Sequence, residues 1–174
     1  ASNAGPDQIL CNVTSSSFAA NTPVTGTGLW TLIAGTGTIA SPSSPSSSVS
    51  GLSVGTNTFQ WTISNGSCPP SSDQMSIIIS ALPSTANAGP DQNLCNITSS
   101  AFAANTPTVG TGLWTLIAGT GTITTPSSPT STVTGLSVGT NTFQWTVSNG
   151  SCPSSSDEMD IIISAPPSAS DAGP

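Results

Sequence analysis

Four cysteines are the residues of this chain whose chemistry their spacing constrains most. Cys11 and Cys68 recur 84 positions later as Cys95 and Cys152. Four cysteines allow three pairings. Those that repeat with the period are Cys11–Cys68 with Cys95–Cys152, or a link through Cys68–Cys95. No histidine is present to complete a zinc site, so we expect disulfides and an oxidising, extracellular setting.

Acidic residues are the second group that could do chemistry. Calcium takes six to eight oxygen ligands, and backbone carbonyls can supply those that carboxylates do not. The candidate ligands are Asp7 and Asp73 in one half of the chain, and Asp91, Asp157 and Glu158 in the other. We favour solvated acids that keep the chain in solution, and we expect no cofactor; calcium stays the alternative.

The composition excludes several classes of function. The chain has no Lys, Arg or His and no Tyr, and its net charge is −7. Without a basic group near neutrality, Ser and Thr have nothing to activate them, so we expect no enzymatic activity. Without Lys and Arg, neither nucleic acid nor an anionic membrane surface is an expected partner. No apolar run is long enough to insert into a bilayer.

An internal repeat organises the whole sequence. Residues 1–84 and 85–168 agree at about four positions in five, and residues 169–174 begin the pattern a third time. We expect one domain in 1–84, a second in 85–168 and the start of a third in 169–174. The chain then reads as a slice of a longer array.

Short runs of apolar residues separated by Gly, Pro and Asn indicate strands. In the first repeat the expected strands are Gln8–Cys11, Ser15–Ala20, Gly28–Ala34, Thr36–Ala40, Ser47–Leu52, Asn57–Ser64 and Gln74–Ser80. The pattern predicts an all-β fold: two tandem immunoglobulin-like β-sandwiches of about seven strands each. The expected core tryptophans are Trp30, Trp61, Trp114 and Trp145.

The strand pattern also favours one cysteine pairing. We expect Cys11, in the first strand, and Cys68, in the last hairpin turn, at the same pole of the sandwich. Cys95 begins the next domain, at the opposite pole of the first. A seven-residue strand is about 23 Å long, whereas a disulfide needs Cα atoms within about 7 Å, so this distance disfavours a link between Cys68 and Cys95. The prediction is therefore Cys11–Cys68 and Cys95–Cys152.

Several motifs resemble one family. They are NAGPDQ…LC, NTPTVGTGLWTLIAGTGTI, SSPTSTVTGLSVGTNTFQWTVSNGSCPS and DEMDIIIS. Together they look like the PKD-like or immunoglobulin-like repeats of giant cell-surface adhesins in Bacteroidetes, including those of gliding cells. The resemblance implies type IX secretion, a cell-surface location and a filament of tens of repeats.

The expected function is structural. Disulfide-stapled repeats joined by Pro-containing segments form a stiff stalk that holds a binding module away from the cell. The expected partners are neighbouring repeats of the same chain, other filaments or surface glycans. Two alternatives stay open: a subunit that polymerises noncovalently by strand exchange, and a glycan-binding or ice-binding repeat that uses its Thr-rich strands.

Overall fold

The structure is a computed structural model that describes residues 1–169, and these residues form β-strands and no helix. The seven strands of the first repeat are β1 (Gln8–Cys11), β2 (Ser15–Ser17), β3 (Thr27–Ala34), β4 (Thr38–Ile39), β5 (Ser48–Ser50), β6 (Gly55–Ser64) and β7 (Ser71–Ser80). No segment within 1–169 is a helix that could cross a membrane.

The second repeat contains the same seven strands. They are β8 (Gln92–Cys95), β9 (Ser99–Ala101), β10 (Thr111–Ala118), β11 (Thr122–Ile123), β12 (Thr132–Thr134), β13 (Gly139–Ser148) and β14 (Ser155–Ser164). The predicted fold of two sandwiches with about seven strands each is confirmed. Residues 170–174, which carry most of the expected start of a third repeat, lie outside the described residues.

The chain divides into two compact units. The first holds Ala1–Leu82 together with the hairpin tip Gly150–Cys152, and the second begins at Pro83. The sequence placed this boundary two residues later, after residue 84.

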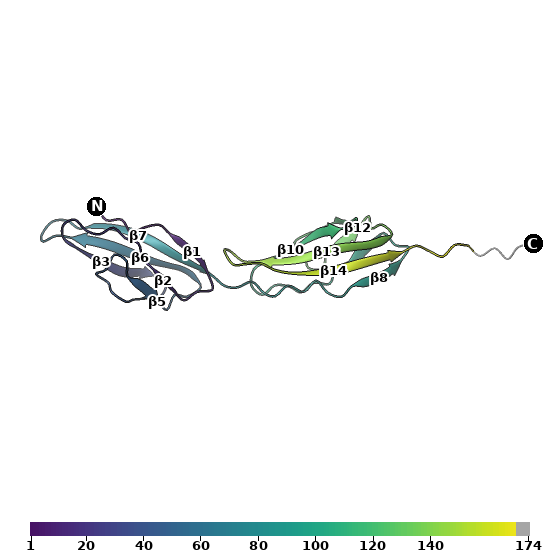
Figure 1. Ribbon diagram of the computed structural model, residues 1–174, viewed down its shortest axis with the longest axis horizontal. Coiled ribbons are helices and arrows are strands. Elements are labelled where there is room, and N and C mark those ends of the chain that lie inside the picture. Colours follow the sequence, from purple (N-terminus) through teal and green to yellow (C-terminus); the bar gives the residue numbers. More distant parts are fainter. Residues whose placement is uncertain (170–174) are drawn as a thin grey trace, which may run out of the picture. The chain divides into compact units, whose positions relative to one another are not determined.

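Each unit pairs a four-stranded sheet with a three-stranded sheet (Figure 1). In the first unit the orders are β1-β7-β6-β3 and β2-β5-β4, and in the second β8-β14-β13-β10 and β9-β12-β11. All neighbours are antiparallel except the short first strand of each repeat, since β1 runs parallel to β7 and β8 runs parallel to β14. This exception decides where the cysteines lie.

The core forms because the long strands alternate apolar and polar side chains. On β6, Phe59 and Trp61 point inward and are fully buried, while Gln60 between them is partly exposed. Trp30 on β3 packs between Trp61 and Phe18, with ring centroids 5.2 Å and 4.1 Å away. All four tryptophans of the chain are buried.

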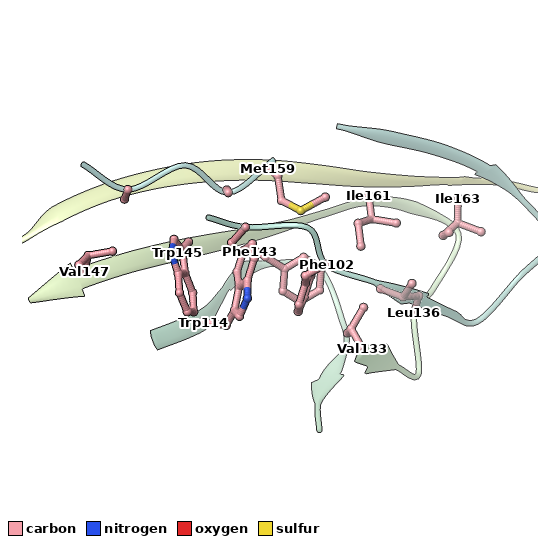
Figure 2. Close-up of a cluster of buried hydrophobic side chains, with 13 residues drawn as sticks. Phe102, Trp114, Val133, Leu136, Phe143, Trp145, Val147, Met159, Ile161 and Ile163 are labelled. Atoms are coloured by element: carbon pink, nitrogen blue, oxygen red, sulfur yellow. The ribbon is translucent and has the colours of Figure 1, made fainter. Parts of the chain in front are cut away.

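The second repeat builds the same core (Figure 2). Phe102 stacks on Trp114 at 4.0 Å between centroids, and Trp145 lies 5.2 Å from Trp114. Figure 2 shows Met159, Ile161 and Ile163 closing this cluster from β14. Such packed aromatic pairs stabilise the fold by more than the apolar area that they bury accounts for.

One buried polar side chain fixes the loops at the start of β6. The Asn57 oxygen accepts a hydrogen bond from Thr36 N at 2.8 Å, and its amide nitrogen donates to Ser53 O at 2.9 Å and to Ile77 O at 3.3 Å. Asn57 has no exposed surface. Asn141 makes the equivalent bonds in the second repeat. A single amide thus joins the loop after β3, the turn before β6 and strand β7.

Candidate functional site: a disulfide joint and an amino-terminal clasp

The disulfide in this structure joins Cys11 to Cys152, with 4.9 Å between the Cα atoms. Strand β1 positions Cys11, because its parallel register with β7 sets Cys11 opposite Ser80. The next residue, Asn12, donates its N–H to the Ser80 carbonyl at 2.8 Å. The Cys152 sulfur lies 3.5 Å from the same carbonyl oxygen, so the end of β7 forms the seat of the bond.

The predicted pairing of Cys11 with Cys68, and of Cys95 with Cys152, is wrong. Cys11 lies opposite Ser80 at the carboxyl end of β7, whereas Cys68 precedes Ser71 at its amino end. These ends are about 30 Å apart at the usual rise per strand residue, and a disulfide needs Cα atoms within about 7 Å. Because β1 runs parallel to β7, the first strand and the last hairpin turn place their cysteines at opposite poles.

The other two cysteines are unpaired and exposed. Cys95 is the repeat equivalent of Cys11, and its surroundings are built in the same way. Its register partner is Ser164 on β14, and Asn96 N donates to the Ser164 carbonyl at 3.0 Å. Cys68 is the repeat equivalent of Cys152 and occupies the hairpin between β6 and β7.

Cys68 lines a cavity with a volume of about 330 Å³. The loop before β3 also lines this cavity, with Pro23, Val24 and Thr25. The Val24 side chain is fully exposed there. An unpaired thiol and a bare valine therefore face one concave site.

In the second repeat, Ser84 holds the equivalent loop. Its hydroxyl oxygen accepts hydrogen bonds from Thr108 N at 2.9 Å and Val109 N at 2.8 Å, and its own N–H donates to the Val109 carbonyl at 3.0 Å. All three bonds use main-chain groups of the loop. The Ser84 hydroxyl also bonds the Thr108 hydroxyl at 3.0 Å. Val24 at the equivalent position has no such group, so the main-chain bonds are the part of this binding mode that the swap of Val24-Thr25 for Thr108-Val109 leaves possible.

The acidic side chains clasp the start of each repeat to its last strand. Asp73 on β7 accepts from Ala4 N at 2.8 Å, and Asp7 accepts from Ser76 N at 2.8 Å. Asp157 and Asp91 make the same bonds to Ala88 N and Asp160 N. Such charge-assisted bonds are stronger than neutral ones, so these four aspartates have a structural role in the sandwich.

The calcium candidates are not gathered into one cluster. Within residues 1–169, no three Asp, Glu, His or Cys side chains group closely enough to hold a metal ion. Glu158 accepts a hydrogen bond from the Gln144 amide at 3.0 Å, and Asp160 accepts one from the Thr142 hydroxyl at 2.7 Å. Each carboxylate named here already has a protein donor.

Sequence reasoning missed the roles of Ser80 and Ser84. Ser80 is one polar residue at the end of an apolar strand, and nothing in its type indicates that it seats a disulfide. Ser84 has a weak signal: the loop that it binds contains adjacent residues in reversed order in the two repeats, as main-chain recognition tolerates. Requiring each pairing to repeat inside the chain removed Cys11–Cys152 from consideration.

Comparisons with known proteins agree on the fold. Neither a protein-family model nor a curated protein sequence matches the chain. Among solved structures, extracellular domains 3–5 of Drosophila OTK align with a TM-score of 0.62 at 9% identity, covering 91% of this chain and 59% of that one. Immunoglobulin domains 1–5 of Sidekick-1 align with 0.61 at 11% identity, covering 93% and 38%.

Titin domains I67–I69 give a TM-score of 0.55 at 12% identity, covering 94% of this chain and 64% of that one. The chain thus spans less than two thirds of each of these three structures. At such identities the similarity concerns the fold, and it establishes the two sandwiches as tandem immunoglobulin-like domains.

Proposed function

We propose that the chain is a structural segment of an extracellular, cell-surface protein, in which immunoglobulin-like repeats form a stalk that holds a binding module away from the cell. The observation that carries this proposal is the disulfide between Cys11 and Cys152, which are 141 positions apart and belong to different sequence repeats. Disulfides persist in oxidising compartments outside the cytosol. The fold similarity to extracellular domains of OTK and to immunoglobulin domains of Sidekick-1 supports the same setting.

The position of the bond suits a chain under tension. Force applied along the backbone reaches Cys11, crosses the disulfide to Cys152, and continues from there. Residues 12–151, which include β2 to β13, lie off this path. The covalent bond then carries the load while most of both sandwiches is shielded from it, which is the property that a stalk requires.

The surface chemistry fits the same role. With no Lys or Arg, the chain offers trypsin-like proteases no cleavage site, and its charge of −7 favours solubility of a surface rich in Ser and Thr. The motif resemblance extends the proposal to an adhesin exported by the type IX route. In that setting the partners are neighbouring repeats, other filaments or surface glycans, and the role is non-enzymatic.

Labelling of intact cells tests the proposal. An antibody raised against the 174-residue segment is applied to unpermeabilised source cells and detected by immunogold microscopy, with a cytosolic protein as the negative control. We expect label on extended material outside the cell. We also expect a band well above 17.1 kDa on denaturing electrophoresis with reductant. Label that appears only after permeabilisation would contradict the proposal.

A further inference from the structure

We propose that Cys68 and its cavity are the docking site for a second copy of this repeat, which presents Cys95 and the segment Ser164–Ser168, and that a Cys95–Cys68 disulfide closes the joint. The inference builds on the proposed function in treating the repeats as units joined in series. Its partner is another immunoglobulin-like repeat of the same sequence, bound head to tail.

The two unpaired cysteines are the repeat equivalents of the two bonded ones. Cys95 and Cys68 correspond through the 84-residue period to Cys11 and Cys152, which are bonded to each other. The two bonded residues therefore show that these two sites of the repeat are complementary. The main-chain arrangement around Cys95 already matches that around Cys11. Asn96 N donates to the Ser164 carbonyl, as Asn12 N donates to the Ser80 carbonyl. Both unpaired thiols are exposed, so a partner can reach them.

The cavity beside Cys68 also favours this occupant. Its wall contains the loop Pro23–Thr25, and the corresponding loop of the second repeat binds Ser84 through Thr108 N, Val109 N and the Val109 carbonyl. The occupant that fits is therefore a segment ending in a Ser84-type residue. Residues Ser164–Ser168 read SAPPS and residues 80–84 read SALPS, so Ser168 takes the place of Ser84.

The chemistry of the joint balances as a thiol–disulfide exchange. The thiolate of one cysteine attacks a disulfide oxidant, such as oxidised glutathione or a disulfide oxidoreductase, and forms a mixed disulfide. The thiolate of the second cysteine then attacks the sulfur of the first cysteine in this mixed disulfide and expels the oxidant's other sulfur as a thiolate. Two thiols are oxidised to one Cys95–Cys68 bond, and one oxidant disulfide is reduced to two thiols, which take up the two protons.

A pair of complementary variants tests the proposal. Cys68→Ser keeps Cys95, and Cys95→Ser keeps Cys68, while both keep the Cys11–Cys152 bond. Each is isotopically distinguished, incubated alone and as an equimolar mixture in a glutathione redox buffer, and analysed on non-reducing denaturing gels with peptide mass mapping. We expect the mixed Cys95–Cys68 dimer to exceed either homodimer at least about tenfold, and the wild-type chain to form a ladder that reductant collapses.

A substitution outside the cysteines separates docking from random thiol oxidation. Ser168→Ala in the Cys68→Ser chain removes the hydroxyl that is to bind Val24 N and Thr25 N. Loss of two hydrogen bonds should slow formation of the mixed dimer about tenfold. Ser156→Ala, an exposed position on β14, is the matched control and should leave the rate unchanged.

Three results would overturn the inference. They are homodimers of either variant as abundant as the mixed dimer, a Cys68–Cys95 bond within one wild-type chain, and a rate insensitive to Ser168→Ala. None of these touches the Cys11–Cys152 bond or the surface location on which the proposed function rests. The variant experiments can therefore refute the Cys95–Cys68 bond without refuting the proposed function, which the labelling of intact cells tests.

Discussion

Asn57 shows how much of each sandwich depends on a single buried amide. Its oxygen and nitrogen satisfy main-chain groups of Thr36, Ser53 and Ile77 that lie far apart in the sequence. A buried polar group that loses its partner retains the full cost of desolvation. Asn57 is thus a point at which a small change should have a large effect.

Asn57→Ala should lower the free energy of unfolding by about 2–3 kcal/mol, because it removes the hydrogen bonds of a fully buried amide to three main-chain groups, one of them the carbonyl of buried Ile77. Urea denaturation followed by tryptophan fluorescence measures the change. Asn93→Ala, at an exposed position on β8, is the control and should change stability by less than about 0.5 kcal/mol. An equal effect of both variants would remove Asn57 from this role.

At the residue level the sequence predicts apolar positions better than polar ones. The burial of Trp30 and Trp61 follows from their place in alternating strands, since one face of each strand must be covered. Asn57 carries no such signal: it stands in the strand sequence NTFQWTIS and looks like an ordinary strand-end residue. Its partners come from loops that only the folded chain brings together.

At the scale of elements, the aspartate clasp ties the start of each repeat to its last strand. Asp73→Ala removes the acceptor of Ala4 N, and Ala4 is fully buried. We expect amide exchange at Ala4 to accelerate about tenfold or more, as loss of one charge-assisted bond implies. Ala88, held by Asp157 in the second repeat, is the matched internal control. Unchanged exchange at Ala4 would show that the clasp contributes nothing.

The same clasp bears on calcium. Because the carboxylates of Asp7, Asp73, Asp91 and Asp157 already accept main-chain N–H groups, we expect no calcium-dependent stabilisation. The midpoint of thermal unfolding should differ by less than about 2 °C between excess calcium and chelator, since a ligand stabilises only as far as it binds the folded state. Magnesium at the same ionic strength is the control. A fall of many degrees specific to calcium removal would place a metal at these aspartates.

The strands themselves were largely predictable, and their pairing was not. Gln8–Cys11 matches β1, and the other expected ranges differ from the observed strands at their ends, where propensity is weakest. The parallel register of β1 on β7 is invisible in the sequence, because the pattern of a strand of four residues does not distinguish parallel from antiparallel pairing. Because this direction was not known, the prediction placed Cys11 at the same pole of the sandwich as Cys68, whereas it lies at the other pole.

At the scale of the whole molecule, the central claim is that one disulfide carries tension past most of both repeats. The bond closes a loop across 141 positions. In a fully extended chain this loop corresponds to a contour length of about 500 Å at up to 3.6 Å per residue. The sequence alone predicted cross-linked domains, but it assigned each cross-link to a single repeat.

Single-molecule stretching from the two chain ends tests this claim most directly, with the same molecule pulled before and after addition of reductant. The predicted result is that the oxidised chain extends only through residues outside Cys11–Cys152, and that about 500 Å of further contour length appears once the bond is reduced. Cys152→Ser is the control and should give the full extension without reductant. Domain-unfolding steps in the oxidised wild-type chain, at the forces where the reduced chain unfolds, would contradict the account.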